Sequence, residues 1–97
     1  EEISITVPVS EQQFLEAFLI YPNPADDLFN IRLEGQPDNF LVIDLINLTG
    51  QKVWSETLDF QSGTILKAIS CENLPRGVYL VRVADARRSS TRKISIQ

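Results

Sequence analysis

The sequence predicts an all-β domain, folded as an antiparallel β-sandwich of about seven strands. Short segments alternate apolar and polar residues, which is the period of a strand with one buried face. Turn residues recur about every 8–12 positions, and no long helical pattern interrupts them. The 97 residues, 43% of them hydrophobic, suffice for one domain with its own core.

Residues 1–17 are open to three interpretations: a linker, an N-terminal strand or a short helix. Residues 3–7 alternate apolar and polar side chains, which favours a short strand or a linker. Ser10, with Gln13 three residues later, matches a helix N-terminus, and apolar residues follow at helical spacing. We expect a turn or short helix here, and a strand from about Phe18.

Residues 21–25, Tyr-Pro-Asn-Pro-Ala, end that first strand. Neither proline can donate to a strand ladder, and each biases the residue before it toward extended geometry. We interpret the segment as a rigid corner with Tyr21 packed over it. Asn23, Asp26 and Asp27 carry oxygen atoms that calcium could use, but they lack the ligand spacing of a calcium loop, so we expect no metal.

Four further strands are predicted over residues 28–34, 40–47, 51–58 and 64–70. The first alternates, so one of its faces is buried. The second is apolar on both faces apart from Asp44, which predicts a central strand. Gly50 ends the connection between the second and third strands, where we expect a positive φ beside a bulge.

The segment 74–84 is the clearest turn-then-strand signal in the chain. Pro75 suits the second position of a β-turn, and Gly77 can adopt the positive φ that such a turn often needs. The residues after Gly77 are apolar on both faces, so we expect a central strand. Tyr79 at the strand start is similar to the tyrosine corner of Ig-like sandwiches, in which the hydroxyl bonds backbone across the corner.

A polar loop over residues 85–90 leads to the last predicted strand, residues 91–97. Its two faces differ in polarity: Ile94 and Ile96 lie on one, and Thr91, Lys93, Ser95 and Gln97 on the other.

The net charge of −4 conceals an uneven distribution. Residues 1–75 contain three basic and twelve acidic residues, a net charge of −9, whereas residues 76–97 contain six basic residues and Asp85, a net charge of +5. Two interpretations stay open: a solvated hairpin that protects a sheet edge, or a basic docking surface for an anionic partner. We expect no nucleic acid partner, because the rest of the domain is acidic and no aromatic residues interleave with the basic ones.

The side chains that most enzymes depend on are missing. The chain has no histidine, which excludes Ser-His and Cys-His nucleophile pairs, and it has no glycine-rich phosphate loop. Its single cysteine, Cys71, is interpreted as a small buried or turn residue. We therefore predict a protein without catalytic residues or cofactor. No apolar run approaches the roughly 20 residues of a membrane-spanning helix.

Four motifs in a fixed order resemble the C-terminal sorting domain of the type IX (Por) secretion system. They are Tyr-Pro-Asn-Pro-Ala at 21–25, Leu-Ile-Asn-Leu-Thr-Gly-Gln-Lys-Val at 45–53, Leu-Pro-Arg-Gly-Val-Tyr-Leu-Val at 74–81, and Lys-Ile-Ser-Ile-Gln at 93–97. Each motif alone is weak, but their order and spacing make the match specific over residues 18–97. At two positions the chain departs from the family, which more often has an aromatic residue and Asp where Ile46 and Asn47 stand; the departure keeps the bulk and the turn chemistry.

The resemblance implies an Ig-like sandwich at the end of a secreted bacterial protein. Such a domain passes through the periplasm, is read by an outer-membrane translocon, and is usually removed by a sortase-like surface protease, which leaves the upstream cargo domain on the cell surface or outside the cell. The resemblance also implies that the translocon recognises the last strand, that is Lys93, Ile94, Ser95, Ile96 and Gln97. The structural motif positions are Tyr21, Pro22, Asn23, Pro24, Gly50, Leu74, Pro75, Gly77 and Tyr79. Because the chain starts at Glu1 without a signal peptide, we expect it to be a segment of a longer protein.

From the basic last hairpin and this resemblance together we predict docking through Lys93 and Ser95, with an exposed edge available for strand addition. An isolated domain could also form a homodimer through edge strands. The alternative function is an Ig-like or fibronectin-like adhesion or carbohydrate-binding module, for which Trp54 and Tyr21 are the candidate aromatic platforms. A structural spacer is the third hypothesis.

Overall fold

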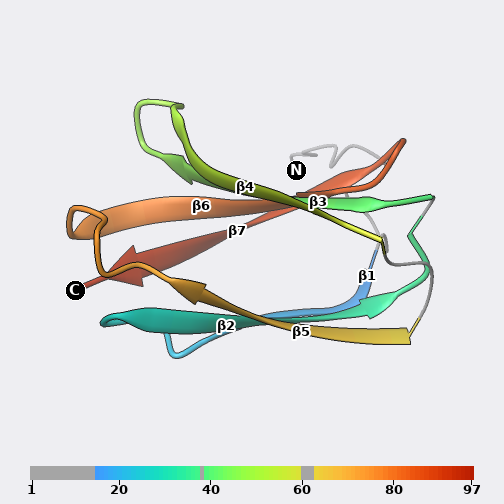
Figure 1. Ribbon diagram of the computed structural model, residues 1–97, viewed down its shortest axis with the longest axis horizontal. Coiled ribbons are helices and arrows are strands. Elements are labelled where there is room, and N and C mark those ends of the chain that lie inside the picture. The colour runs from blue at the N-terminus through green and yellow to red at the C-terminus, as the bar shows by residue number, and fades with distance from the viewer. Residues whose placement is uncertain (1–14, 38, 60–62) are drawn as a thin grey trace, which may run out of the picture.

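The computed structural model describes residues 15–37, 39–59 and 63–97, and within them every regular element is a strand. The seven strands are β1 Leu15–Tyr21, β2 Leu28–Gly35, β3 Leu41–Asn47, β4 Lys52–Leu58, β5 Gly63–Ser70, β6 Gly77–Ala84 and β7 Ser89–Ile96. Figure 1 shows them as two layers facing each other. The predicted all-β sandwich is confirmed.

The strands divide into a three-stranded sheet in the order β1-β2-β5 and a four-stranded sheet in the order β4-β3-β6-β7. All sheet pairings between neighbouring strands are antiparallel. β3 and β6 lie inside the larger sheet, as their apolar faces predicted, and β7 lies at its edge (Figure 1). The chain changes sheet between β2 and β3, between β4 and β5, and between β5 and β6, which is the connectivity of a sandwich rather than of one continuous meander.

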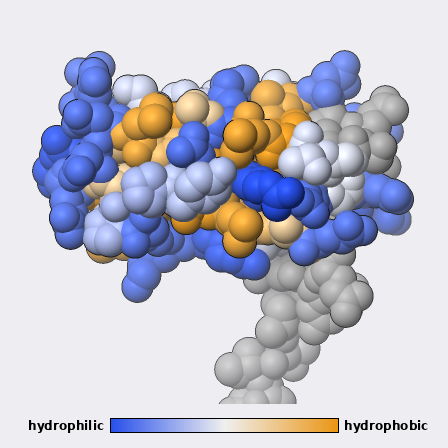
Figure 2. Space-filling view, turned by 90° about the horizontal axis from the view of Figure 1, so that it is seen from below, coloured by the Kyte–Doolittle hydropathy of each residue, from blue (hydrophilic) through white to orange (hydrophobic). Residues whose placement is uncertain are grey.

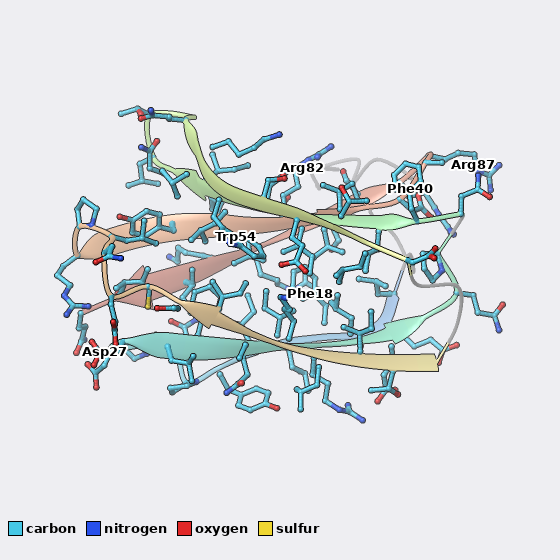
Figure 3. The ribbon with its side chains drawn as sticks, viewed as in Figure 1. Phe18, Asp27, Phe40, Trp54, Arg82 and Arg87 are labelled. Atoms are coloured by element: carbon cyan, nitrogen blue, oxygen red, sulfur yellow. The ribbon has the colours of Figure 1, made fainter. Side chains whose placement is uncertain are left out.

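Alternate residues of both sheets point inward and form one core. Its buried members are Phe18, Ala25, Phe29, Ile31, Leu33, Leu41, Ile43, Leu45, Ile69, Cys71, Tyr79, Val81, Val83, Ile94 and Ile96. Phe18 and Trp54 both point into the space between the sheets (Figure 3). The inward-facing residues of the last strand therefore belong to the main core, and the end of the chain is anchored to the fold.

Two strands begin at least two residues earlier than the pattern predicted. β1 begins at Leu15, three residues before the predicted start, and β7 begins at Ser89, two residues before it. In β1, Phe18 is 8% exposed while its neighbour Leu19 is 50% exposed, so successive side chains point to opposite faces as a strand requires. The predictions for residues 1–14 lie outside the described residues.

The predicted turn chemistry is confirmed at both glycines. Gly50 has φ of 89° and lies beside the bulge between β3 and β4, where the Asn47 side chain accepts hydrogen bonds from the Thr49 and Gln51 amides at 3.1 and 2.9 Å. Gly77 has φ of 149°, and the Tyr79 hydroxyl donates to the Pro75 carbonyl at 2.5 Å, which is the predicted corner bond.

The outer face of the β1-β2-β5 sheet carries exposed apolar side chains. Figure 2 views this face and shows hydrophobic groups spread across it between hydrophilic ones. The large apolar residues exposed there are Leu19, Tyr21, Leu28 and Leu66. Arg32 lies between Leu19 and Leu66 in the strand register and pairs with Glu34.

Candidate functional site

The last residues of β7 are held on both sides. On one side they pair with β6, from Gly77 opposite Ile96 to Ala84 opposite Ser89. On the other side lies the proline corner, residues 21–25, in which the Tyr21–Pro22 and Asn23–Pro24 peptide bonds are cis. The corner brings Ala25 into a parallel bridge with Ile96. A segment that is 70 residues away in the sequence therefore lies along the outer edge of the last strand.

Asn23 and Ala25 provide the contacts. The Asn23 amide donates to the Lys93 carbonyl at 3.1 Å and accepts from the Ser95 amide at 3.1 Å. The Ala25 amide donates to the Ser95 carbonyl, and the Gln97 amide donates to the Ala25 carbonyl, both at 2.8 Å. Ala25 is fully buried, so its two backbone bonds form inside the fold, whereas the two bonds of the Asn23 side chain are exposed.

The predicted exposed edge for strand addition is therefore wrong for the end of the chain. A docking strand would pair with the outward backbone groups of this edge, but the corner already bonds them. They are the Lys93 carbonyl, the Ser95 amide and carbonyl, and the Gln97 amide. Strand addition at residues 93–97 would first have to displace residues 23–25. The predicted homodimer through edge strands stays a prediction, and β4 and β5 are edges at which it can be sought.

The side chains of the last strand follow the predicted alternation. Ile94 and Ile96 are buried in the core, with exposed fractions of 0% and 2%. Lys93 and Gln97 are exposed and Ser95 is half-buried on the outer face of the sheet. With its backbone edge bonded and its apolar residues buried, the strand offers partners its outward side chains.

A third motif, residues 74–81, contacts the same end of the molecule. Arg76, in the turn before β6, donates to the Asp26 carbonyl at 2.9 Å and lies 3.7 Å from the Asp27 carboxylate. The Cys71 amide also donates to the Asp27 carbonyl, at 2.8 Å. Figure 1 shows the chain end, the β5–β6 connection and the start of β2 together on one side. The motifs at 21–25, 74–81 and 93–97 thus form one connected structure.

The basic segment is partly neutralised within the domain. Arg76, Arg82 and Arg88 lie near Asp27, Asp44 and Asp85 at 3.7, 3.6 and 2.8 Å. Arg92 lies over the Phe18 ring, 4.9 Å from its centroid, and contributes a cation–π contact between the edge strands of the two sheets. The net charge of +5 is therefore an incomplete guide to the surface, and the outward-facing cations decide what a partner meets.

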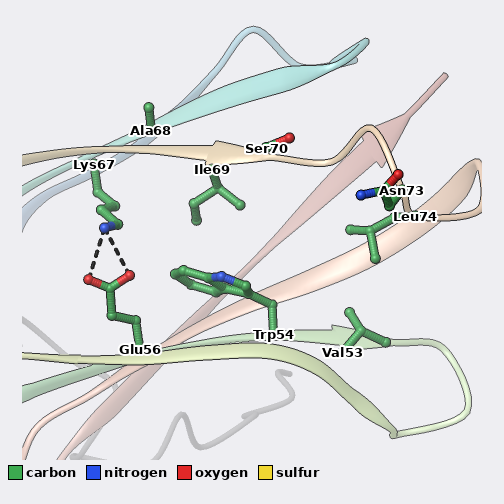
Figure 4. Close-up of a pocket in the computed structure, with 9 residues that line it drawn as sticks. All are labelled: Val53, Trp54, Glu56, Lys67, Ala68, Ile69, Ser70, Asn73 and Leu74. Atoms are coloured by element: carbon green, nitrogen blue, oxygen red, sulfur yellow. Dashed lines mark hydrogen bonds and ion pairs between the residues drawn. The ribbon is translucent and has the colours of Figure 1, made fainter.

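The two aromatic residues of the adhesion hypothesis lie on different surfaces. Figure 4 shows Trp54 between β4 and β5, beside Ile69 and next to the ion pair of Lys67 with Glu56. The cleft there has a volume of about 420 Å³, and Trp54 packs against the core. Tyr21 is exposed on the outer face of the opposite sheet. The two rings therefore cannot form one sugar-binding platform.

Neither a metal centre nor a membrane-spanning helix is found among residues 15–37, 39–59 and 63–97. No three His, Cys, Asp or Glu side chains of these ranges lie close enough to hold a metal ion. No helix in the same ranges has the length and apolar character needed to cross a bilayer.

The position of Cys71 in the core makes its thiol unreactive. It is fully buried, and its thiol donates to the Asp26 carbonyl at 3.2 Å. Burial raises the pKa of the Cys71 thiol above its ordinary value, although the nearby Arg76 charge opposes the shift. The nucleophilic thiolate is therefore disfavoured at neutral pH.

We expect alkylation of Cys71 by iodoacetamide at pH 8 to be much slower in the folded protein than in urea. The same reagent should modify both states at similar rates if the thiol is accessible in the fold, which would contradict its burial. Mass spectrometry of samples quenched over time measures both rates, and the urea-unfolded protein is the control for intrinsic reactivity.

Sequence reasoning named Asn23 as a structural motif position but did not predict that Asn23 and Ala25 hold the last strand. The only available signal was that prolines at 22 and 24 leave Asn23 as a polar side chain fixed between two residues without amide donors. This predicts a specific place for Asn23 but does not identify its partner.

Comparison with known protein families gives one match of high coverage. A family model described as a secretion system C-terminal sorting domain matches residues 19–97. This range contains the corner, the hairpin, the Tyr79 turn and the last strand, so the hydrogen bonds between the corner and the last strand lie within it. A search of curated proteins found no match.

Proposed function

The chain belongs to the family of type IX secretion system C-terminal sorting domains. We propose that it acts as a folded sorting signal, which the secretion machinery recognises through the outward-facing side chains of its last strand. A sorting domain of this kind directs export to the cell surface or the extracellular space. Our proposal adds that Lys93 and Ser95 contact the outer-membrane translocon after the cargo has reached the periplasm.

The bonding of the strand edge supports this proposal. Because the Ser95 amide and carbonyl and the Gln97 amide are bonded to the corner, a partner that leaves the fold intact has side chains to read rather than backbone. Ile94 and Ile96, buried in the core, fix the direction in which Lys93 and Ser95 point. A last strand that is already ordered in the fold binds its partner without the entropy cost of ordering a free tail.

The domain itself serves as a label. Its family is non-catalytic, and we propose that a sortase-like surface protease removes it after export by cutting in or before residues 1–17. Its partners on this proposal are the translocon, that protease and the upstream cargo domain.

An export assay tests the proposal. Residues 1–97 are fused to the C-terminus of a periplasmic reporter in a bacterium that has a type IX secretion system. We expect the reporter in the medium or on the surface, and we expect the double variant Lys93→Glu/Ser95→Glu to reduce that exported fraction about tenfold, the effect of ~1.4 kcal/mol of lost contact.

The control is Thr64→Glu/Ser70→Glu, which also introduces two glutamates, at two exposed positions of β5 on the other sheet. Circular dichroism establishes that both variants are folded. Normal export of a folded Lys93→Glu/Ser95→Glu variant would refute recognition through these side chains. A reporter that stays in the periplasm even with the unsubstituted domain would favour the adhesion-module alternative.

A further inference from the structure

The strand register of the four-stranded sheet aligns four residues, one from each strand, that lie far apart in the sequence. Lys52 of β4 is opposite Ile46 of β3, Ile46 is opposite Leu80 of β6, and Leu80 is opposite Lys93 of β7. We call these four residues the lysine-flanked row. With strands about 4.8 Å apart, the two lysine backbones lie about 14 Å from each other. The row crosses the whole sheet, with cations at its ends and apolar side chains between.

This row lies on the outer face. The residues next to it in β3 and β6, Leu45 and Tyr79, are buried in the core, so Ile46 and Leu80 point the other way. Both are only half-buried, and Lys93 is exposed. The apolar centre of the row is therefore accessible without any rearrangement of the core.

A second row beside it adds another outward cation. Arg82 is opposite Asp44 on β3, and Figure 3 shows Arg82 on the outer side of the sheet. The Asp44 side chain is only 5% exposed because Ser55 donates to it at 2.7 Å while Lys52 and Arg82 lie 3.5 and 3.6 Å from its oxygens. The side chains of Lys52 and Arg82 are 57% and 43% exposed. The carboxylate is covered and the cations above it face outward.

We propose that this outer face, centred on the lysine-flanked row, docks a protein partner that presents an apolar ridge with carboxylates on both sides, about 14 Å apart. The proposal rests on the proposed function and extends the recognised surface from the last strand across the sheet to Lys52. Opposite charge at the rim and apolar contact at the centre are the usual complementarity of a protein interface. Nothing in the family match assigns Ile46, Lys52, Leu80 or Arg82 to recognition.

An anionic lipid surface is the less favoured occupant. Membrane binding by charge takes a cluster of about four to eight Lys or Arg residues. The outer face has Lys52, Arg82 and Lys93, and the first two also neutralise Asp44. The half-buried Ile46–Leu80 pair lies between two lysines whose backbones the sheet holds in place, which suits a protein partner with apolar and acidic side chains at matching positions.

Two single substitutions and two matched controls test the proposal in the export assay. Lys52→Glu reverses the charge at the far end of the row, and Leu80→Ser removes its apolar centre. Arg32→Glu and Leu66→Ser make the same kinds of change on the outer face of the β1-β2-β5 sheet. Thermal melts of all four purified domains establish which are folded. We expect each row variant to reduce the exported fraction about tenfold and each control to leave it unchanged.

The outcomes separate this proposal from the function on which it rests. Normal export of folded Lys52→Glu and Leu80→Ser, together with loss of export for Lys93→Glu/Ser95→Glu, would confine recognition to the last strand and overturn the proposal alone. Equal losses for the Leu66→Ser control would place the contact on the other sheet and also overturn it. Binding of the purified domain to phosphatidylglycerol vesicles, lost with Lys52→Glu, would identify a lipid instead of a protein.

If Leu80→Ser does not fold, Leu80→Lys and Ile46→Lys provide the second measurement. Lysine keeps a long aliphatic stem over the sheet but places a charge where the apolar ridge would sit. Export by folded forms of both variants at the normal level would refute the apolar centre of the contact, whereas a roughly tenfold loss would support it.

Discussion

Replacement of Ile94 by alanine is expected to lower the free energy of unfolding by roughly 2–5 kcal/mol, a large share of the roughly 5–15 kcal/mol that stabilises a domain of this size. Ile94 is fully buried and lies in the part of β7 that carries the proposed recognition residues. Its loss leaves a cavity beneath Lys93 and Ser95. Urea denaturation followed by tryptophan fluorescence, which uses Trp54, measures the change.

The control for Ile94→Ala is Leu19→Ala, an aliphatic truncation on the other sheet at a residue that is 50% exposed. Substitutions at such surface positions usually change stability by less than about 0.5 kcal/mol. If Ile94→Ala costs less than about 1 kcal/mol, the last strand is not an integral part of the core, and recognition of an unfolded tail would become the better account.

Asn23→Ala is expected to release the outer edge of the last strand while the sandwich stays folded. The substitution removes the amide that joins the Lys93 carbonyl to the Ser95 amide. Two hydrogen bonds at an exposed site contribute about 1–2 kcal/mol, because water replaces part of what is lost. Denaturation midpoints should fall modestly, and export should fall because Lys93 and Ser95 no longer have fixed positions.

Asn30→Ala is the matched control, since the Asn30 amide donates to the Tyr21 carbonyl instead of to β7. If export is unchanged for Asn23→Ala but lost for Asn30→Ala, the partner requires the corner itself rather than the hydrogen bonds from the corner to the last strand.

The strands were predictable because their chemistry is local. Alternation in 28–34 identified a half-buried strand, the apolar run at 40–47 identified a central one, and Gly50 and Tyr79 adopted the predicted turn geometry. In contrast, the start of β7 at Ser89 was missed because five of the six residues 85–90 are polar. Polar strands at a sheet edge give no periodic signal.

The arrangement of the candidate site was not predictable from the pattern. The bonds from residues 23 and 25 to residues 93–97 join segments about 70 positions apart. Apart from the Asn23 side-chain amide, they use backbone groups, which every residue has. A strand at the end of a chain is ordinarily an open edge, and only the fold reveals that this one is covered. The lysine-flanked row depends in the same way on three pairings and a bulge that shifts Lys52 into line with Ile46.

The central claim is that the corner bonds the edge of the last strand and thereby fixes the side chains that a partner reads. Amide hydrogen exchange at Ser95, followed by NMR in the unsubstituted protein and in Asn23→Ala, tests it most directly. We predict that the Ser95 amide is protected in the first and exchanges about 5- to 30-fold faster in the second, the equivalent of ~1–2 kcal/mol, while the amides of β2 keep their protection. Exchange of Ser95 in the unsubstituted protein at the rate of an unstructured peptide would contradict the claim.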